Sequence, residues 1–261
     1  TFGIPGSAGI PISSAKNTIV CPYNNIDVFY RVVKKYHNQI AACIIEPVCG
    51  NMGVVLPGRN FLLGLREITA RYNIILIFDE VITGFRFCLG GVQNIFNVYP
   101  DLTCLGKIIG GGFPIGAYGG KADIMDYVAP EGKVYQAGTL SGNPIAVSAG
   151  LYTIKTLARM DYNKLERKTI RLCDGLCRKL ADRKIDFCLN RFGSMFTLFF
   201  TSHKVVDFKT AKTSDTRKYA AYFWKMLKKG VYFTPSQFEA NFVSFSHTDI
   251  DIDRTIRAAA S

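Results

Sequence analysis

The sequence has 261 residues, 48% of them hydrophobic, so it is long enough to bury a core in one large domain or two smaller ones. No run approaches the roughly 18 apolar residues of a membrane span, and the first residues lack the features of a signal peptide, so we expect a soluble, cytoplasmic protein without a membrane partner. The net charge of +12 comes from 32 basic and 20 acidic residues that are interspersed, which is typical of solvated helices and argues against a nucleic-acid partner.

The first half of the chain predicts helices and strands in alternation. Residues 2–13 are rich in Gly, Pro and Ser and indicate a loop, whereas residues 26–36 carry apolar side chains at helical spacing. The short apolar run at residues 40–45 predicts a strand covered on both faces, and a helix at 61–72 leads to a second buried strand at 74–78. This order implies a right-handed parallel crossover.

The same pattern continues towards the middle of the chain. We expect a third short strand at residues 102–105 and a strand that turns back at 116–120. A short helix at 121–127 and a polar loop at 134–144 follow, and Pro144 can open a helix at 145–157.

The second half has a different pattern, in which helices and short strands follow each other closely. The expected helices cover residues 161–183, 219–229 and the stretch from 249, and the expected strands cover 187–189, 194–200, 231–233 and 242–245. We therefore predict part of a large α/β domain at residues 1–157 and a smaller carboxy-terminal α+β domain at residues 158–261.

The cysteines give no sign of a metal site. The chain has eight cysteines but no Cys-x-x-Cys pair, and none of its three histidines lies near Cys173 and Cys177 in the sequence. We expect free thiols in a reducing compartment and no bound metal.

One lysine stands out as a candidate catalytic residue. Lys107 lies among apolar and glycine residues, where an ammonium ion is poorly solvated, so its site should supply an anion or use the amine as a nucleophile. The residues Gly110–Gly112 leave the following backbone free to approach a ligand. The alternative is a surface lysine before an ordinary turn.

Two acids are expected near this lysine. Glu46 and Asp79 each follow a predicted parallel strand, and ligands of such sheets bind beyond the carboxyl ends of the strands. Asp79 and Lys107 together suit pyridoxal 5'-phosphate, because a lysine bonds its aldehyde and a carboxylate keeps its ring nitrogen protonated. Thr139 and the amides of its loop suit a phosphate. For Asp79 alone, a helix cap or a salt bridge is the alternative.

Four motifs resemble the class III, fold type I pyridoxal-phosphate enzymes, and within that class the aminomutases that act on glutamate-1-semialdehyde. The motifs are EPVCGNMG at 46–53, FDEVITGFR at 78–86, residues 101–112 and YQAGTLSGNP at 135–144. The resemblance covers essentially the whole chain and implies the fold type I architecture, with a mainly parallel sheet, flanking helices and a smaller carboxy-terminal domain.

The resemblance also implies roles for residues that contact the cofactor. Lys107 matches the lysine that forms a Schiff base and moves a proton between substrate carbons, and Asp79 matches the acid bonded to the pyridine nitrogen. Val81 and Gly138 are assigned to the cofactor site with them. Thr139 matches the residue that reaches the phosphate in the neighbouring subunit, which implies a homodimer with shared active sites.

Three further residues concern the substrate and the reaction type. Asn51 matches the segment near the ring hydroxyl and the substrate, and Glu239 is similar to a substrate-side acid. For Glu239, a solvated loop acid is the alternative. Many aminotransferase relatives have Gln where this chain has Ile82, so an apolar residue there resembles the aminomutases.

The implied reaction converts glutamate-1-semialdehyde, an amino-aldehyde, to 5-aminolevulinate by intramolecular amino transfer in tetrapyrrole (porphyrin) synthesis. The cofactor would enter as pyridoxamine 5'-phosphate, Lys107 would be the base, and residues 2–13 resemble the end of a lid. Two alternatives stay open: a class III aminotransferase that acts between two substrates, and a non-catalytic basic α/β protein that binds a partner.

The family pattern includes an amino-terminal segment, with a Ser-Gly-Thr-type phosphate cup and a ring-stacking aromatic residue, that this sequence does not show. We therefore expect a sheet with an exposed apolar edge and face. Either the sequence is a fragment of a longer chain, which we favour, or a separate chain completes it.

Overall fold

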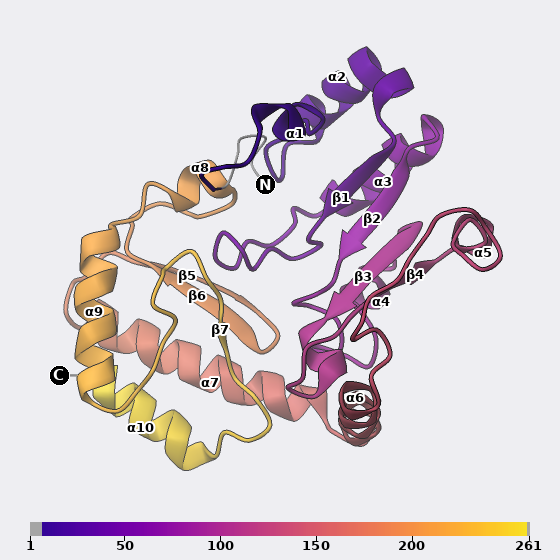
Figure 1. Ribbon diagram of the computed structural model, residues 1–261. Coiled ribbons are helices and arrows are strands. Elements are labelled where there is room, and N and C mark those ends of the chain that lie inside the picture. Colours follow the sequence, from indigo (N-terminus) through magenta and orange to yellow (C-terminus); the bar gives the residue numbers. More distant parts are fainter. Residues whose placement is uncertain (1–6, 260–261) are drawn as a thin grey trace.

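The computed structural model describes residues 7–259 and contains two sheets with helices around them (Figure 1). The first sheet has the order β1-β2-β3-β4 and the second has the order β5-β6-β7. The strands are β1 Ala42–Ile45, β2 Ile75–Asp79, β3 Leu102–Gly106, β4 Gly116–Gly120, β5 Cys188–Phe192, β6 Met195–Phe199 and β7 Asn241–Phe242. This is a mostly parallel α/β sheet followed by a smaller antiparallel sheet, as predicted.

The helices lie between and around these strands. They are α1 Ile12–Lys16, α2 Ile26–Tyr36, η1 His37–Gln39, α3 Phe61–Arg71, α4 Val92–Phe96, η2 Lys107–Gly110, α5 Ala122–Met125, α6 Pro144–Leu157, α7 Tyr162–Ala181, α8 Phe208–Ala211, α9 Thr216–Lys228 and α10 Asp249–Ala259. Of the predicted loop and lid at residues 2–13, residues 1–6 lie outside the described part of the chain, and Ile12 and Ser13 belong to α1.

The first sheet confirms the predicted crossover. β1 pairs with β2 and β2 with β3 in parallel, whereas β4 returns antiparallel beside β3. Asp79, the last residue of β2, is in register with Cys104 of β3. The carboxyl ends of the three parallel strands therefore share one edge of the sheet.

Only one face of this sheet is well covered, so the prediction of a strand covered on both faces is wrong for β1. Leu76 and Phe78 of β2 are buried against α2 and α3, which supply Phe29 and Leu65 to the same core. On β1, which is an edge strand, Ile44 is 63% exposed. The reason is that α2 and α3 both pack on the same face of the sheet. The other face and the edge strand β1 are left exposed, as we expected.

The second sheet packs on both of its faces through β6. Phe196 and Leu198 point into the core formed with α7, α9 and α10, whereas Met195 and Phe199 belong to cores shared with the first half of the chain. The alternation of side chains along a strand explains this division. Because β6 serves both halves, the predicted boundary at residue 157 stays a prediction.

Helix starts follow the expected capping chemistry. The Asn143 side chain accepts a hydrogen bond from the Ala146 N–H, and Pro144 occupies the first turn of α6, where its missing N–H costs nothing. Asp161 and Asp215 cap α7 and α9 in the same way.

Three details differ from the sequence-based expectations. The strand expected at residues 242–245 is only the two-residue β7, Asn241–Phe242. No strand forms at residues 231–233: the Val231 N–H donates to the Met226 carbonyl at the end of α9, the Thr234 N–H donates to the Asn241 side chain, and Phe233 is buried by ring contacts with Phe196 and Tyr222. The short helices α4 and α8 were not predicted, since each has too few residues for a clear periodicity.

Candidate active site

The predicted lysine and acid lie at adjacent strand ends. Asp79 ends β2, and Lys107 directly follows Gly106, the last residue of the neighbouring strand β3. The structure therefore brings Asp79 and Lys107 to the same edge of the sheet, where open α/β sheets bind ligands.

The backbone at Lys107 is unusual. Lys107 has a φ of 48°, in the left-handed region that costs free energy for a residue with a Cβ. Its side chain is exposed and has no hydrogen bond or ion pair among residues 7–259. The expectation of a poorly solvated ammonium is thus wrong for this chain, because the η2 turn places the lysine beyond the strand end.

The glycines after Lys107 serve packing as well as backbone freedom. Gly111 and Gly112 have positive φ values of 58° and 101°. A Cβ on Gly111 would lie 2.6 Å from Thr153 Oγ1 and 2.7 Å from the Ala149 carbonyl oxygen, and both of those residues belong to α6. A Cβ on Gly150 of α6 would likewise overlap the Ile109 carbonyl oxygen. Gly111 therefore lets this turn approach α6 closely, and the expected approach of the backbone to a ligand stays a prediction.

Asp79 is held by the turn that follows it. Its Oδ1 accepts a hydrogen bond from the Val81 N–H at 3.0 Å, and its side chain is half-buried. Val81 in turn packs against the backbone before Lys107, since a Cβ on Gly106 would lie 3.2 Å from Val81 Cγ1. The second oxygen of Asp79 has no partner among the described residues, so it can accept a bond from a protonated ring nitrogen.

Glu46 organises the loop that contains Asn51. Its carboxylate accepts hydrogen bonds from the Gly50 N–H at 2.6 Å and from the Asn51 amide at 2.7 Å. Ile82 packs over this loop, because a Cβ on Gly50 would lie 2.8 Å from Ile82 Cδ1. The predicted residues Asn51 and Ile82 therefore meet at the same loop: Asn51 is held by Glu46, and Ile82 packs on Gly50.

Glu239 is tied to the same loop from the second half of the chain. The Gly53 N–H donates to the Phe238 carbonyl at 2.6 Å, and the Thr197 hydroxyl donates to the Glu239 carbonyl at 2.9 Å. The Glu239 side chain is exposed. Glu239 and Asn51 are therefore held within one hydrogen-bonded segment.

Sequence reasoning missed the role of Glu80. This carboxylate is completely buried and accepts hydrogen bonds from the Val92 N–H at 2.6 Å and from the Thr83 hydroxyl at 3.0 Å. Glu80 therefore connects the turn that follows Asp79 to the first residue of α4. An acid directly after a strand-end acid, followed by Thr83, was the available signal.

Arg86 closes the same motif and was not predicted either. Its Nε donates to the Ile82 carbonyl at 2.8 Å, and its guanidinium lies 4.1 Å from the centre of the Phe242 ring. Burial lowers the pKa of Arg86 to about 10. The guanidinium stays charged at neutral pH and links the motif to β7.

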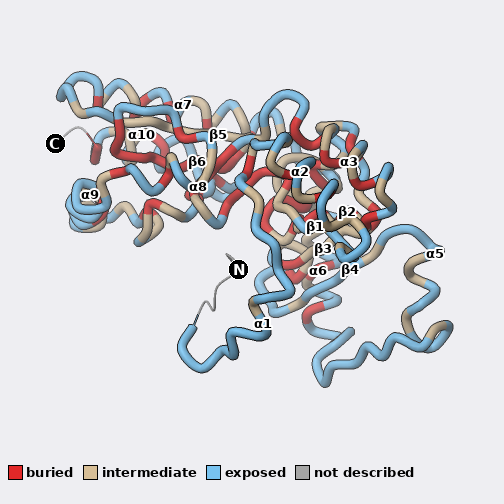
Figure 2. Tube along the Cα trace, turned by 90° about the horizontal axis from the view of Figure 1, so that it is seen from above, coloured by how far each residue is buried: buried red, intermediate tan, exposed pale blue. Residues whose placement is uncertain are grey.

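Thr139 and Gly138 are not brought to Lys107. Both lie in the exposed loop between α5 and α6, and Figure 2 shows that this part of the chain extends away from the body as a mostly exposed arm. The predicted role of Thr139 at the phosphate therefore stays a prediction.

The thiols show the chemistry of buried cysteines. Burial raises the pKa of Cys43 to about 12 and that of Cys49 well above its ordinary value, so both stay protonated. Within residues 7–259, no three His, Cys, Asp or Glu side chains are grouped as metal ligands. In the same described range, no helix is both long and apolar enough to span a bilayer.

Comparison with known proteins gives matches over nearly the whole chain. The sequence profile described as Aminotransferase class-III matches residues 6–251. The glutamate-1-semialdehyde 2,1-aminomutase of Natranaerobius thermophilus is 54% identical over 261 residues, which is 99% of this chain and 60% of that protein. The enzyme of the same name from Aquifex aeolicus is 52% identical, over 98% of this chain and 61% of that protein. The chain thus spans about 60% of the length of these relatives.

Solved structures agree on the fold. An omega-transaminase from Sphaerobacter thermophilus superposes with a TM-score of 0.89 at 30% identity, over 98% of this chain and 59% of that one. A glutamate-1-semialdehyde-aminomutase from Pseudomonas aeruginosa has a TM-score of 0.84 at 24% identity, over 97% of this chain and 58% of that one.

Proposed function

This chain belongs to the class-III aminotransferase family, and from that premise we propose that it takes part in the isomerisation of glutamate-1-semialdehyde to 5-aminolevulinate, with pyridoxal 5'-phosphate or pyridoxamine 5'-phosphate as cofactor. The relatives above 50% identity carry the name of that reaction, which supports the choice of substrate. The observation that carries the proposal is the position of Asp79 and Lys107 at adjacent strand ends.

The residues at this edge fit the cofactor. When bound, the cofactor supplies an aldehyde or amine and a ring that withdraws electrons from the substrate carbon. The free oxygen of Asp79 would hold the proton on the ring nitrogen, and Val81 would lie beside the ring. Lys107, exposed and unpaired, would carry the cofactor and then move a proton between the two substrate carbons. Each step uses a group that has no competing partner among the described residues.

The segment of Asn51 and Glu239 supports the assignment of a substrate side. Glu46 fixes Asn51 near Ile82, and the Gly53–Phe238 hydrogen bond holds Glu239 close to that loop. An apolar Ile82 leaves no hydrogen-bonding group at a position where many relatives with two substrates have Gln. We propose that this favours transfer within one substrate over transfer between two.

A homodimer with shared sites is part of the same proposal. The arm and α6 expose large apolar side chains, including Tyr135 at 84% and Tyr152 at 76%. Several large apolar side chains exposed on neighbouring segments are typical of subunit interfaces. Thr139 and Gly138 lie on that arm, and we propose that they bind the cofactor phosphate of the partner subunit. We further propose the cytoplasm as the location, since all eight cysteines are free thiols.

Covalent trapping of the cofactor tests the proposal. The purified chain would be incubated with pyridoxal 5'-phosphate, reduced with borohydride and digested, and the modified peptide identified by mass spectrometry. We expect the adduct on Lys107 and its loss in Lys107→Ala, whereas Lys133→Ala, at another exposed lysine, should retain it.

Conversion of substrate separates the remaining alternatives. Formation of 5-aminolevulinate without an added keto acid supports the isomerase. Transamination of an external keto acid would indicate the two-substrate aminotransferase instead. Absence of any adduct on Lys107 would favour the non-catalytic alternative.

A further inference from the structure

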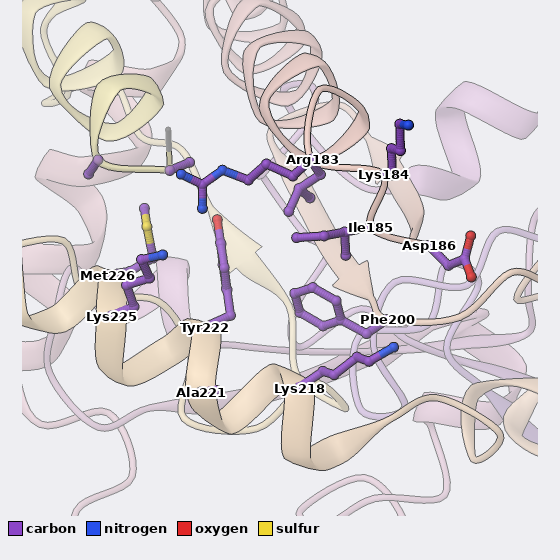
Figure 3. A pocket seen from close by; sticks show the side chains of 13 residues that line it. Arg183, Lys184, Ile185, Asp186, Phe200, Lys218, Ala221, Tyr222, Lys225 and Met226 are labelled. Carbon is purple, nitrogen blue, oxygen red and sulfur yellow. The ribbon is translucent and has the colours of Figure 1, made fainter. Parts of the chain in front are cut away.

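A cavity of about 380 Å³ lies far from the proposed active site, between the end of α7, α9 and α10. In Figure 1 these helices lie on the opposite side of the molecule from β1–β4. Figure 3 shows apolar side chains such as Ile185, Phe200 and Met226 around its interior. We call it the α9 pocket. Its volume is at the lower end of the range for small-molecule sites, so it suits a compact ligand.

One polar atom inside the α9 pocket lacks a partner. The Tyr222 hydroxyl oxygen is buried and forms no hydrogen bond with any described residue. The Tyr222 ring is fixed by contacts with Phe200, at 5.5 Å between centroids, and with Phe233, at 5.7 Å. A buried hydroxyl without a partner is unfavourable, so an acceptor that enters the pocket would be stabilised there. Burial raises the pKa of Tyr222, so the hydroxyl remains a donor at neutral pH.

The rim of the α9 pocket is strongly basic. Arg183 and Lys184 from the turn after α7, and Lys218 and Lys225 from α9, line it together with a single acid, Asp186. In Figure 3 the Arg183 guanidinium and the Tyr222 hydroxyl point toward the same region of the pocket. The surrounding stretch, residues 178–229, has 13 basic and four acidic residues, so it holds most of the excess charge of the chain. Such a rim attracts anions.

We propose that the α9 pocket binds a small monocarboxylate with an apolar body. The apolar body would lie against Phe200 and Met226, and the carboxylate would accept a hydrogen bond from Tyr222 and face the cations of the rim. A neutral ligand would gain no charge attraction from Lys184, Lys218 and Lys225, and a larger acyl chain would exceed the cavity. The site is independent of Lys107 and of the proposed reaction.

Calorimetric titration of the purified chain with 4-phenylbutanoate tests this site, with the neutral 4-phenylbutanamide as the matched ligand. We expect saturable binding of the carboxylate. The amide should bind at least about tenfold more weakly than the carboxylate, because charge-assisted hydrogen bonds are stronger than neutral ones. Tyr222→Phe, which removes only the hydroxyl, should weaken carboxylate binding by about threefold to tenfold. Ala221→Trp should fill the opening from an exposed position and abolish binding.

A pair of lysines on α9 supplies the control for charge. Lys225 lines the pocket, whereas Lys228 lies one turn further on and does not. Lys225→Gln should weaken binding by about threefold, in line with a partly exposed ion pair, and Lys228→Gln should change it by less than about twofold. Equal effects of the two variants, equal affinity for the amide, or no saturable binding of the carboxylate would each overturn the proposal. Retained circular dichroism and retained trapping of cofactor on Lys107 would exclude misfolding as the cause.

Discussion

The Asn51 side-chain amide donates a hydrogen bond to the Glu46 carboxylate, with 2.7 Å between Nδ2 and Oε1. The other carboxylate oxygen accepts the Gly50 N–H at 2.6 Å. Glu46 follows β1, so a single acid at a strand end fixes both the backbone and the side chain of the loop that we place on the substrate side. The orientation of Asn51 therefore depends on the charge at position 46.

Glu46→Gln should loosen this loop. The variant keeps one acceptor oxygen but presents an NH₂ group to one of two donors, so we expect the free energy of unfolding to fall by about 1–2 kcal/mol. Urea denaturation measures the change. Glu239→Gln is the control, because the Glu239 side chain is exposed and makes no hydrogen bond among the described residues. A loss in the control as large as in Glu46→Gln would contradict the role given to Glu46.

Asp101 should be a major source of stability. Its carboxylate lies 2.9 Å from Arg66 Nη1 and 2.6 Å from Lys121 Nζ, and it accepts the Leu76 N–H at 2.7 Å. Asp101→Asn would leave these donors without a charged partner at a buried position, which should cost about 3 kcal/mol. Asp161→Asn, at an exposed pair with Arg167, should cost less than about 1 kcal/mol by the same urea measurement, since Asn also caps helices well.

The contribution of Asp101 should also depend on pH. Burial acts to raise the pKa of Asp101, but hydrogen bonds from Lys121, the Leu76 N–H and Arg66 outweigh it and lower the pKa below the ordinary 3.8. A lowered folded pKa means that the stabilisation is present above the unfolded pKa and is lost as the pH falls through the folded value. The difference in unfolding free energy between the native chain and Asp101→Asn should stay constant from about pH 7 to 5 and shrink below about pH 4. A constant difference down to pH 2 would rule out this linkage.

Gly111→Ala should damage the turn that carries Lys107. The substitution adds a Cβ at a φ of 58° and places it 2.6 Å from Thr153 Oγ1 of α6. We expect a loss of about 2 kcal/mol or more in stability, since the left-handed conformation alone costs roughly 1–2 kcal/mol. We also expect weaker trapping of cofactor on Lys107. Gly116→Ala is the matched control, because nothing lies within 4 Å of its added Cβ and its φ is not in the left-handed region.

The order of the parallel strands, and the position of Asp79 and Lys107 at adjacent strand ends, could be predicted from the sequence because local signals indicate them. Short apolar runs that end in Glu46 and Asp79 indicated parallel strands, and the structure pairs β2, which ends in Asp79, with β3 in parallel. Pro144 marked the start of α6 for a simple steric reason. These signals need no information on what packs from elsewhere in the chain.

Other features depend on long-range packing, which the sequence pattern does not carry. Ile44 and Ile77 are partners in neighbouring apolar strands and lie on the face away from α2 and α3, yet Ile44 on the edge strand β1 is exposed whereas Ile77 on the internal strand β2 is half-buried. Phe233 looked like part of a strand but is buried by ring contacts. Glu80 was overlooked because its partners, Val92 and Gln93, begin a helix too short to detect.

A dimer that combines two defective chains should regain one working cofactor site. If Thr139 binds the phosphate of the partner's site, a heterodimer of Lys107→Ala and Thr139→Ala has one site with both defects and one with neither. Thr139→Ala homodimers should bind pyridoxal 5'-phosphate about tenfold more weakly, from loss of a hydrogen bond to a charged group, and Lys107→Ala homodimers should show no trapping. Chains with two different affinity tags, co-expressed and purified by both tags, should therefore trap cofactor at about one site per dimer with native affinity, as isologous sharing requires. If the heterodimer traps cofactor only with the weakened affinity, Thr139 serves its own chain and the shared site is wrong.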